Sequence, residues 1–224
     1  MIKLKPRLSI TASMVRQNSR IADVGTDHAY LPAFLILNGM AESAIASDLR
    51  TGPLENAKST VKAYGLEKKV ELRLSDGLEC ICSDEVDDVV IAGMGGILIS
   101  EILEKSNGFM RENLKFIFQP QSHDEVLRKW LFDNGFEILE EKSCFEDEKV
   151  YIAMSAAYTG KISSHGQAEI MFGNYPSLSD ESSKAFVNKK LKRIHTRINA
   201  LEKTETQADE LELLKEIVLE IEHG

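Results

Sequence analysis

The sequence has 224 residues, 43% of them hydrophobic and 28% charged, and a formal net charge of -9 at pH 7. This composition is typical of a globular protein; no apolar run is long enough to span a bilayer, and the first residues lack the apolar core of a secretory signal. Three cysteines are too few for a disulfide framework, which favours reduced thiols and a cytoplasmic location.

The first 157 residues alternate between short apolar runs rich in β-branched residues and helical patterns. Strands are expected at 20–24, 43–48, 70–75, 88–92 and 114–119, and helices at 31–37, 54–64, 97–105 and 124–134. Two further strands, 136–142 and 149–157, are separated by a short acidic loop and suit an antiparallel edge hairpin. The pattern predicts an α/β fold with a mostly parallel, seven-stranded, Rossmann-like sheet, the frame of class I methyltransferases.

The C-terminal part changes to heptad spacing. Apolar residues step by four and three from Val187 to Leu201 and again from Leu211 to Ile221. We therefore expect a helical hairpin, an antiparallel coiled coil, whose seams could also pack between chains, so that the oligomeric state stays open. The expected organisation is a catalytic domain at 1–160, a connecting segment at 161–181 and the hairpin at 182–224.

Charge is segregated along the chain. Residues 184–203 hold seven Lys or Arg against Glu202, whereas residues 204–224 hold seven acids against Lys215. The two helices could simply pair with each other, or the basic helix could follow phosphates of a nucleic acid. The basic candidates on the hairpin are Lys189, Lys190, Lys192, Arg193 and Arg197, and those near the N-terminus are Lys3, Lys5, Arg7 and Arg16.

The end of the first strand carries the clearest ligand signal. Gly25 permits a tight turn and close approach of a ligand, but the three-glycine pattern for a diphosphate is absent. The acids Asp23 and Asp27 on either side of Gly25 would repel a diphosphate and would suit a cation. This sign of charge favours S-adenosylmethionine, with its sulfonium and ammonium groups, over NAD.

Three more strand ends fall in register with this turn. Asp48 is placed to accept hydrogen bonds from ribose hydroxyls, and Asp76 to accept one from an adenine amine, although Asp76-Gly77 alone would be an ordinary turn. Glycines at the fourth strand end would let a base or the transferred methyl approach closely, with a tight structural turn as the alternative. The expected cofactor-binding residues are Asp23, Gly25, Asp27, His28, Asp48, Leu49, Asp76, Gly77, Ala92, Gly93 and Met94.

These motifs together resemble one family. The segments 23–32 (DVGTDHAYLP), 52–54 (GPL), 75–78 (SDGL), 92–96 (AGMGG) and 119–120 (QP), with the terminal hairpin, are similar to the bacterial tRNA (adenine(22)-N1)-methyltransferases, called TrmK. The resemblance covers nearly the whole chain. It implies S-adenosylmethionine as the donor and N1 of an adenine in the tRNA D-arm as the acceptor. No metal is expected, because His123, His165, His195 and His223 show no metal-ligand spacing, and no membrane is expected, because no apolar run is long enough.

An acceptor at N1 sets requirements for the site. The atom lies on a Watson–Crick edge, so the adenine must be unstacked or flipped, and its methylated product is cationic. Asp27 could supply the opposing charge and His28 could shape the turn; alternatively, Asp27 is a helix N-cap and His28 a wall residue. Contacts with the substrate are expected from Arg7, Tyr30, Gly95, Gln119 and the five basic residues of the hairpin, although an aromatic residue such as Tyr30 beside an apolar helix is more often part of the core.

Three rival functions remain on sequence grounds. A methyltransferase acting on another RNA, a protein or a small molecule would use the hairpin for dimerisation. A non-catalytic RNA-binding protein would retain the pocket alone, which the intact acids Asp48 and Asp76 disfavour. An NAD-dependent reductase is disfavoured by the missing glycines and the acidic first turn.

Overall fold

The computed structural model describes residues 2–175, 178–204 and 207–223. The chain divides into two compact units, Met1–Ser163 and Ser164–Gly224. Within the described ranges, no helix is both long enough and apolar enough to cross a membrane.

The first unit is built on one seven-stranded sheet with the order β3-β2-β1-β4-β5-β7-β6. Neighbouring strands among β1 to β5 pair in parallel, and β7 pairs antiparallel with both β5 and β6, as the sequence predicts. The chain reverses its direction of strand addition between β1 and β4, which is where open α/β sheets bind ligands. The strands are β1 Ser19–Val24, β2 Ala41–Asp48, β3 Val70–Leu74, β4 Asp88–Met94, β5 Lys115–Pro120, β6 Phe136–Glu146 and β7 Lys149–Tyr158.

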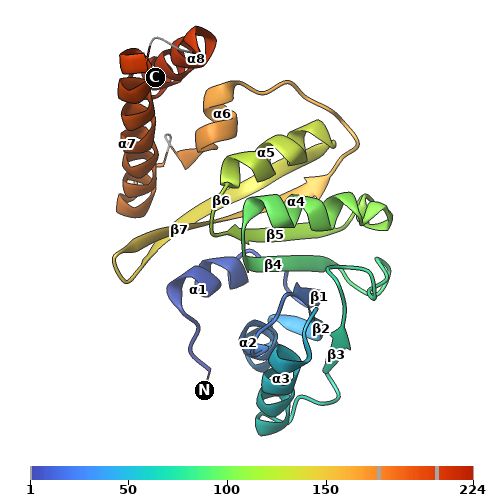
Figure 1. Cartoon of the computed structure of the whole chain (residues 1–224). Helices are drawn as coiled ribbons and strands as arrows, with labels where there is room; N and C mark the ends of the chain where they lie inside the picture. Colours follow the sequence, from blue (N-terminus) through green and yellow to red (C-terminus); the bar gives the residue numbers. More distant parts are fainter. Residues whose placement is uncertain (1, 176–177, 205–206, 224) are drawn as a thin grey trace. The chain divides into compact units, whose positions relative to one another are not determined.

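Helices cover both faces of this sheet (Figure 1). One face carries α1 Pro6–Ala12, α2 Tyr30–Leu37 and α3 Thr51–Ala63; the other carries α4 Gly96–Glu104 and α5 Asp124–Asp133, with the short 3-10 helix η1 at Asn107–Phe109. Because both faces are covered, central strand residues such as Ile21, Val90 and Ile117 are fully buried. Helix α1 is not predicted by the sequence pattern, because seven residues are too few to show a helical period.

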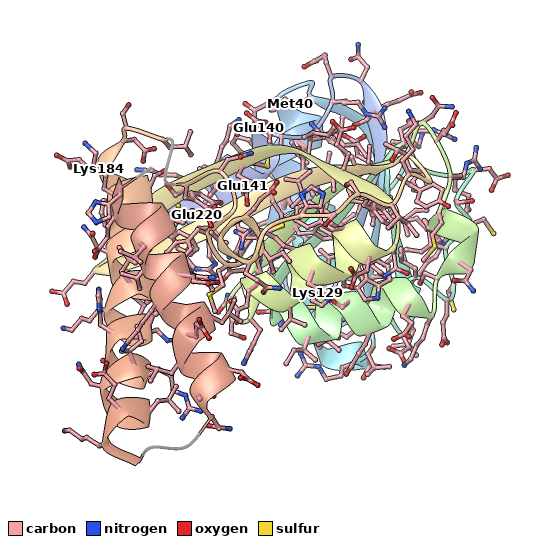
Figure 2. All side chains as sticks on the ribbon, turned by 90° about the horizontal axis from the view of Figure 1, so that it is seen from above. Met40, Lys129, Glu140, Glu141, Lys184 and Glu220 are labelled. Carbon is pink, nitrogen blue, oxygen red and sulfur yellow. The ribbon has the colours of Figure 1, made fainter. Side chains whose placement is uncertain are left out.

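A buried ion network fixes the start of α5. Arg128 is fully buried; its Nη1 donates to Asp124 Oδ2 at 2.6 Å and its Nε to Glu141 Oε1 at 2.9 Å. Glu141, labelled in Figure 2, lies on β6, so the network joins the first turn of α5 to the sheet. The loop before α5 is thereby held in place, and that loop contributes to the candidate site.

The second unit contains α6 Gln167–Phe172, α7 Glu181–Thr204 and α8 Ala208–His223. The predicted seams meet in one core cluster, in which Ile194, Ile198 and Leu201 of α7 pack with Leu214 and Val218 of α8. Ala168 and Phe172 of α6 join the same cluster. The segment 161–181, expected as a plain connection, therefore includes a helix that is too short to show periodicity in the sequence.

Candidate active site

A cavity of about 590 Å³ opens at the carboxyl ends of β1 and β4. Its lining comes from four places: the N-terminal segment with Lys3, Lys5 and Arg7, the end of β1 with the turn that follows it, the end of β4, and Gln121 after β5. Strand β1 contributes Asp23, the turn contributes Gly25, Thr26, Asp27 and His28, α2 contributes Tyr30, and β4 contributes Ala92 and Gly93.

The backbone at Gly25 has a left-handed conformation that side chains rarely adopt. Its φ is +79°, and a Cβ at this position would lie 2.0 Å from Met94 Cε. The N–H groups of Gly25 and Thr26 both donate to the carbonyl of Ser47 at 2.8 Å, which ties the turn to the end of β2. Glycine is therefore required here by its left-handed conformation, whereas the contact with Met94 involves only the flexible end of that side chain.

Asp23 is a buried carboxyl in the cavity wall. It is 7% exposed, and burial raises its pKa from 3.8 to about 6, while a hydrogen bond from the Thr26 hydroxyl acts in the opposite direction. Loss of hydration disfavours the charged form of the carboxyl. A cation brought into the cavity would restore the ionised form, so this wall favours a positively charged ligand.

Asp27 and His28 project from the turn toward solvent. The Asp27 side chain is 70% exposed and its Oδ2 lies 3.3 Å from His28 Nε2. The residue at the N-cap of α2 is Ala29, whose N–H bonds to Thr26 Oγ1 at 3.1 Å. Asp27 is therefore not the helix cap, and the alternative structural explanation of this acid does not hold.

Asp48 and Asp76 lie at the adjacent strand ends rather than in the cavity lining. Asp48 Oδ1 accepts the N–H of Arg50 at 2.8 Å, and the Ser75 N–H donates to the Asp48 carbonyl at 3.0 Å, which places the two strand ends together. Leu49 is 63% exposed. Gly77 has a φ of +56°, and a Cβ there would lie 2.8 Å from Ile102 Cγ2, so its glycine is explained by backbone conformation and packing.

The three glycines at the end of β4 and the start of α4 meet different surroundings. Gly93 lines the cavity, and a Cβ there would have Gln121 Nε2 at 3.8 Å as its nearest neighbour. Gly96 instead packs on the loop before α5, since a Cβ would lie 2.1 Å from the His123 carbonyl oxygen. Gly95 and Met94, both expected at the ligand, are not among the cavity-lining residues: a Cβ at Gly95 would lie 3.1 Å from the Ser122 hydroxyl, and Met94 packs on Gly25.

The expectation for Gln119 needs correction. This side chain is fully buried in β5, and its Nε2 donates to the carbonyls of Pro120 at 3.2 Å and Ile152 at 3.4 Å. It therefore does not present its amide to a substrate. Gln121, two residues on, lines the cavity, and its position as the first polar residue beyond the strand is the signal that could have identified it.

The basic candidates differ in whether their side chains already form ion pairs or hydrogen bonds within the protein. Arg7 lines the cavity, but its Nη1 pairs with Glu146 Oε1 and its guanidinium carbon lies 5.6 Å from the centroid of the Tyr151 ring. On α7, Lys190 donates to the Met171 carbonyl at 2.6 Å and Arg197 pairs with Glu210 at 2.7 Å. Arg7 and Arg197 are thus neutralised locally.

Three of the five basic candidates on α7 are exposed and form no ion pair among the described residues. Lys189, Lys192 and Arg193 are exposed, recur at helical spacing and line a shallow groove with Thr196. Within the described ranges, no ion pair involves any of the three. We call these three residues the basic face of α7.

No group of three or more His, Cys, Asp or Glu side chains is placed to hold a metal ion in the described part of the chain. The cysteines Cys80, Cys82 and Cys144 are free thiols.

Comparison with known proteins identifies the family. A methyltransferase domain family matches residues 4–154. The tRNA (adenine(22)-N(1))-methyltransferase of Bacillus subtilis is 35% identical over 243 residues, covering 100% of this chain and 99% of that protein.

Solved structures agree with this match. The crystal structure of the B. subtilis m1A22 tRNA methyltransferase TrmK has a TM-score of 0.86 at 30% identity, covering 99% of this chain and 97% of that one. A Streptococcus pneumoniae relative in complex with S-adenosyl-L-methionine has a TM-score of 0.81 at 34% identity, covering 96% of this chain and 99% of that one. The chain therefore belongs to the TrmK family of tRNA (adenine(22)-N(1))-methyltransferases.

Proposed function

We propose that this protein transfers the methyl group of S-adenosylmethionine to N1 of adenine 22 in tRNA. The observation that carries the proposal is the full-length match to the B. subtilis enzyme of that name, combined with a buried carboxyl at the strand-end turn. The charge of this site supports the donor, because the buried Asp23 favours a cation and lines the same cavity as Gly25.

The residues at three neighbouring strand ends fit the donor along its length. Asp23 and the Gly25 turn would hold its charged methionine part, Asp48 its ribose hydroxyls and Asp76 its adenine amine; Leu49, Gly77 and Ala92 would line the same path. When bound, the donor supplies an electrophilic methyl group on a sulfonium. The remaining task of the protein is to present the acceptor nitrogen in line with that methyl.

The acceptor side of the cavity is formed by Asp27, His28 and Tyr30. Adenine N1 carries an in-plane lone pair, so that alignment matters more than a strong base. Asp27 is exposed and lies at the cavity, where its carboxylate would stabilise the positive charge that develops on the base. Asp27→Asn, with unchanged cofactor affinity, is expected to lower kcat; an unchanged kcat would exclude this role.

The phosphates of tRNA would be held at two places in the chain. Lys3 and Lys5 line the cavity, and the basic face of α7 lies on the second unit. We propose that residues 182–224 serve tRNA binding, the domain at 1–160 catalysis, and 161–181 the connection between them. A tRNA substrate also supports a cytoplasmic location as part of this proposal.

The test is an incubation with bulk tRNA and labelled S-adenosylmethionine, followed by digestion and identification of the modified nucleoside. Label in N1-methyladenosine is the expected result. Label in another nucleoside would show that the acceptor is not adenine N1, and the absence of label in tRNA would reject the proposal. A chain truncated after residue 180 should bind S-adenosylhomocysteine while losing tRNA methylation, whereas a small-molecule methyltransferase would keep its activity.

A further inference from the structure

Two aromatic rings lie stacked beside the cavity. The rings of His28 and Tyr30 are parallel within 10°, their centroids are 5.0 Å apart, and both residues line the cavity. Tyr30 is 46% exposed and the His28 side chain is 40% exposed. Since so much of both side chains is exposed, neither is a core residue, and the stack presents aromatic surface to whatever enters.

The backbone between the two rings is held in an uncommon conformation. Ala29 has a φ of 52° and a ψ of 28°, in the left-handed region that residues with a Cβ seldom adopt. The Ala29 N–H bonds to Thr26 Oγ1, and Asp27 Oδ2 lies beside the His28 ring nitrogen. A helix could begin here with an ordinary cap and no such strain. Strain retained at this point indicates that the placement of the flanking rings matters.

We propose that the His28–Tyr30 stack is the surface on which the flipped target base rests, adding a third ring to the existing two. This inference rests on the proposed function, because methylation at N1 requires a base that has left its own stack. Every base has a π face, so the stack holds the base without reading its identity. Polar groups that contact the edge of the base must then select adenine. Asp27 and Gln121 line the same cavity and are the candidates for these contacts.

The charge of the product suits the same surface. Methylation at N1 gives a cationic base, and a cation over a tyrosine face is attracted by the ring quadrupole. The stack therefore supports the base both before and after transfer. A change at Tyr30 should weaken binding of the nucleotide and leave binding of the donor unaffected.

The test uses a tRNA transcript with 2-aminopurine at position 22, whose emission is quenched when the base stacks. With enzyme saturated in S-adenosylhomocysteine, the Tyr30→Ala complex should be brighter than the wild-type complex, and the Tyr30→Phe complex should match the wild type. On unmodified tRNA, Tyr30→Ala should lower kcat/KM by about 5- to 150-fold, mainly through KM, and Tyr30→Phe by less than about twofold.

Two controls separate stacking from folding. Tyr64 is a similarly exposed tyrosine at the end of α3, outside the cavity lining, so Tyr64→Ala should leave emission and kcat/KM unchanged. Tyr30→Leu keeps apolar bulk without a ring and should behave as Tyr30→Ala does, with S-adenosylhomocysteine affinity by calorimetry as in the wild type.

The outcomes are distinct. If the wild type is active and the Tyr30→Ala and Tyr30→Leu variants keep its emission and kcat/KM, the proposed role of the His28–Tyr30 stack is wrong. The proposed function would then remain intact. A wild type that does not methylate tRNA would overturn both.

Discussion

Replacing the Asp23 carboxyl by an amide should change the stability of the ligand-free protein in a pH-dependent way. Burial raises the pKa of Asp23 from 3.8 to about 6, so the folded state holds the proton more tightly than the unfolded chain does. The stability that the protonated Asp23 carboxyl contributes to the folded state is therefore fully present below about pH 4, declines as the pH rises, and is lost above about pH 6. The difference between the pKa values of Asp23 in the folded and unfolded states corresponds to about 3 kcal/mol of unfolding free energy. Asp23→Asn should stabilise the ligand-free protein by up to that amount at pH 7.5 and by almost nothing at pH 4.

The same carboxyl should make cofactor binding pH-dependent. With a pKa of about 6, roughly a tenth of the protein carries an ionised Asp23 at pH 5 and roughly nine-tenths at pH 7. If the cationic donor binds the ionised form, its affinity should fall about tenfold from pH 7 to pH 5, and binding below pH 6 should release a proton. Asp23→Asn should bind the donor more weakly and without this pH dependence.

Calorimetry at pH 5, 6, 7 and 8, in pairs of buffers with different ionisation enthalpies, measures both the affinity and the proton release. Thermal melts of the two proteins over the same range measure stability. A wild-type affinity that does not change with pH, or an Asp23→Asn protein that binds S-adenosylmethionine as tightly as the wild type, would refute the role of Asp23 as the partner of the cation.

Three further expectations concern the turn, the ion network and the second unit. Gly25→Ala should abolish donor binding in calorimetry, and adding Met94→Ala should restore little, because the positive φ of Gly25 remains strained; full restoration would show that the clash alone matters. Arg128→Met removes the cation of a buried network and should cost about 3–5 kcal/mol in urea unfolding; a loss below about 1 kcal/mol would contradict the network's role. Neutralising the basic face of α7 should weaken tRNA binding and reduce the slope of log K against log salt by roughly 0.7–0.9 for each lost phosphate contact. Arg197 lines the same groove but is already paired with Glu210, so Arg197→Ala should change the slope less than the triple variant does; an unchanged slope for the triple variant would count against phosphate binding.

Much of the fold could be predicted because its strands are buried on both faces and punctuated by glycine turns. The sheet with its antiparallel edge hairpin and the two apolar seams of α7 and α8 all follow from periodicity. Helices α1 and α6 could not be predicted in this way, because their seven and six residues are too few to show a helical period. Their positions are set by tertiary packing, which local sequence does not encode.

The candidate site shows a similar division. The Asp23–Gly25–Asp27 turn was identifiable because charge and a strand-end glycine act locally. Contacts between distant segments were not: the pairing of Arg7 with Glu146 spans 139 residues of sequence. The burial of Gln119 and the packing of Met94 on Gly25 likewise depend on neighbouring strands.

The most direct measurement is methylation of an unmodified tRNA transcript that carries adenine at position 22, compared with the same transcript carrying guanine there. Incubation with labelled S-adenosylmethionine, followed by position mapping through reverse-transcription stops, locates the methyl group. The expected result is one N1-methyladenosine at position 22 of the first transcript and no label in the second. Equal labelling of both transcripts, or a methyl group mapped elsewhere in the tRNA, would contradict the account.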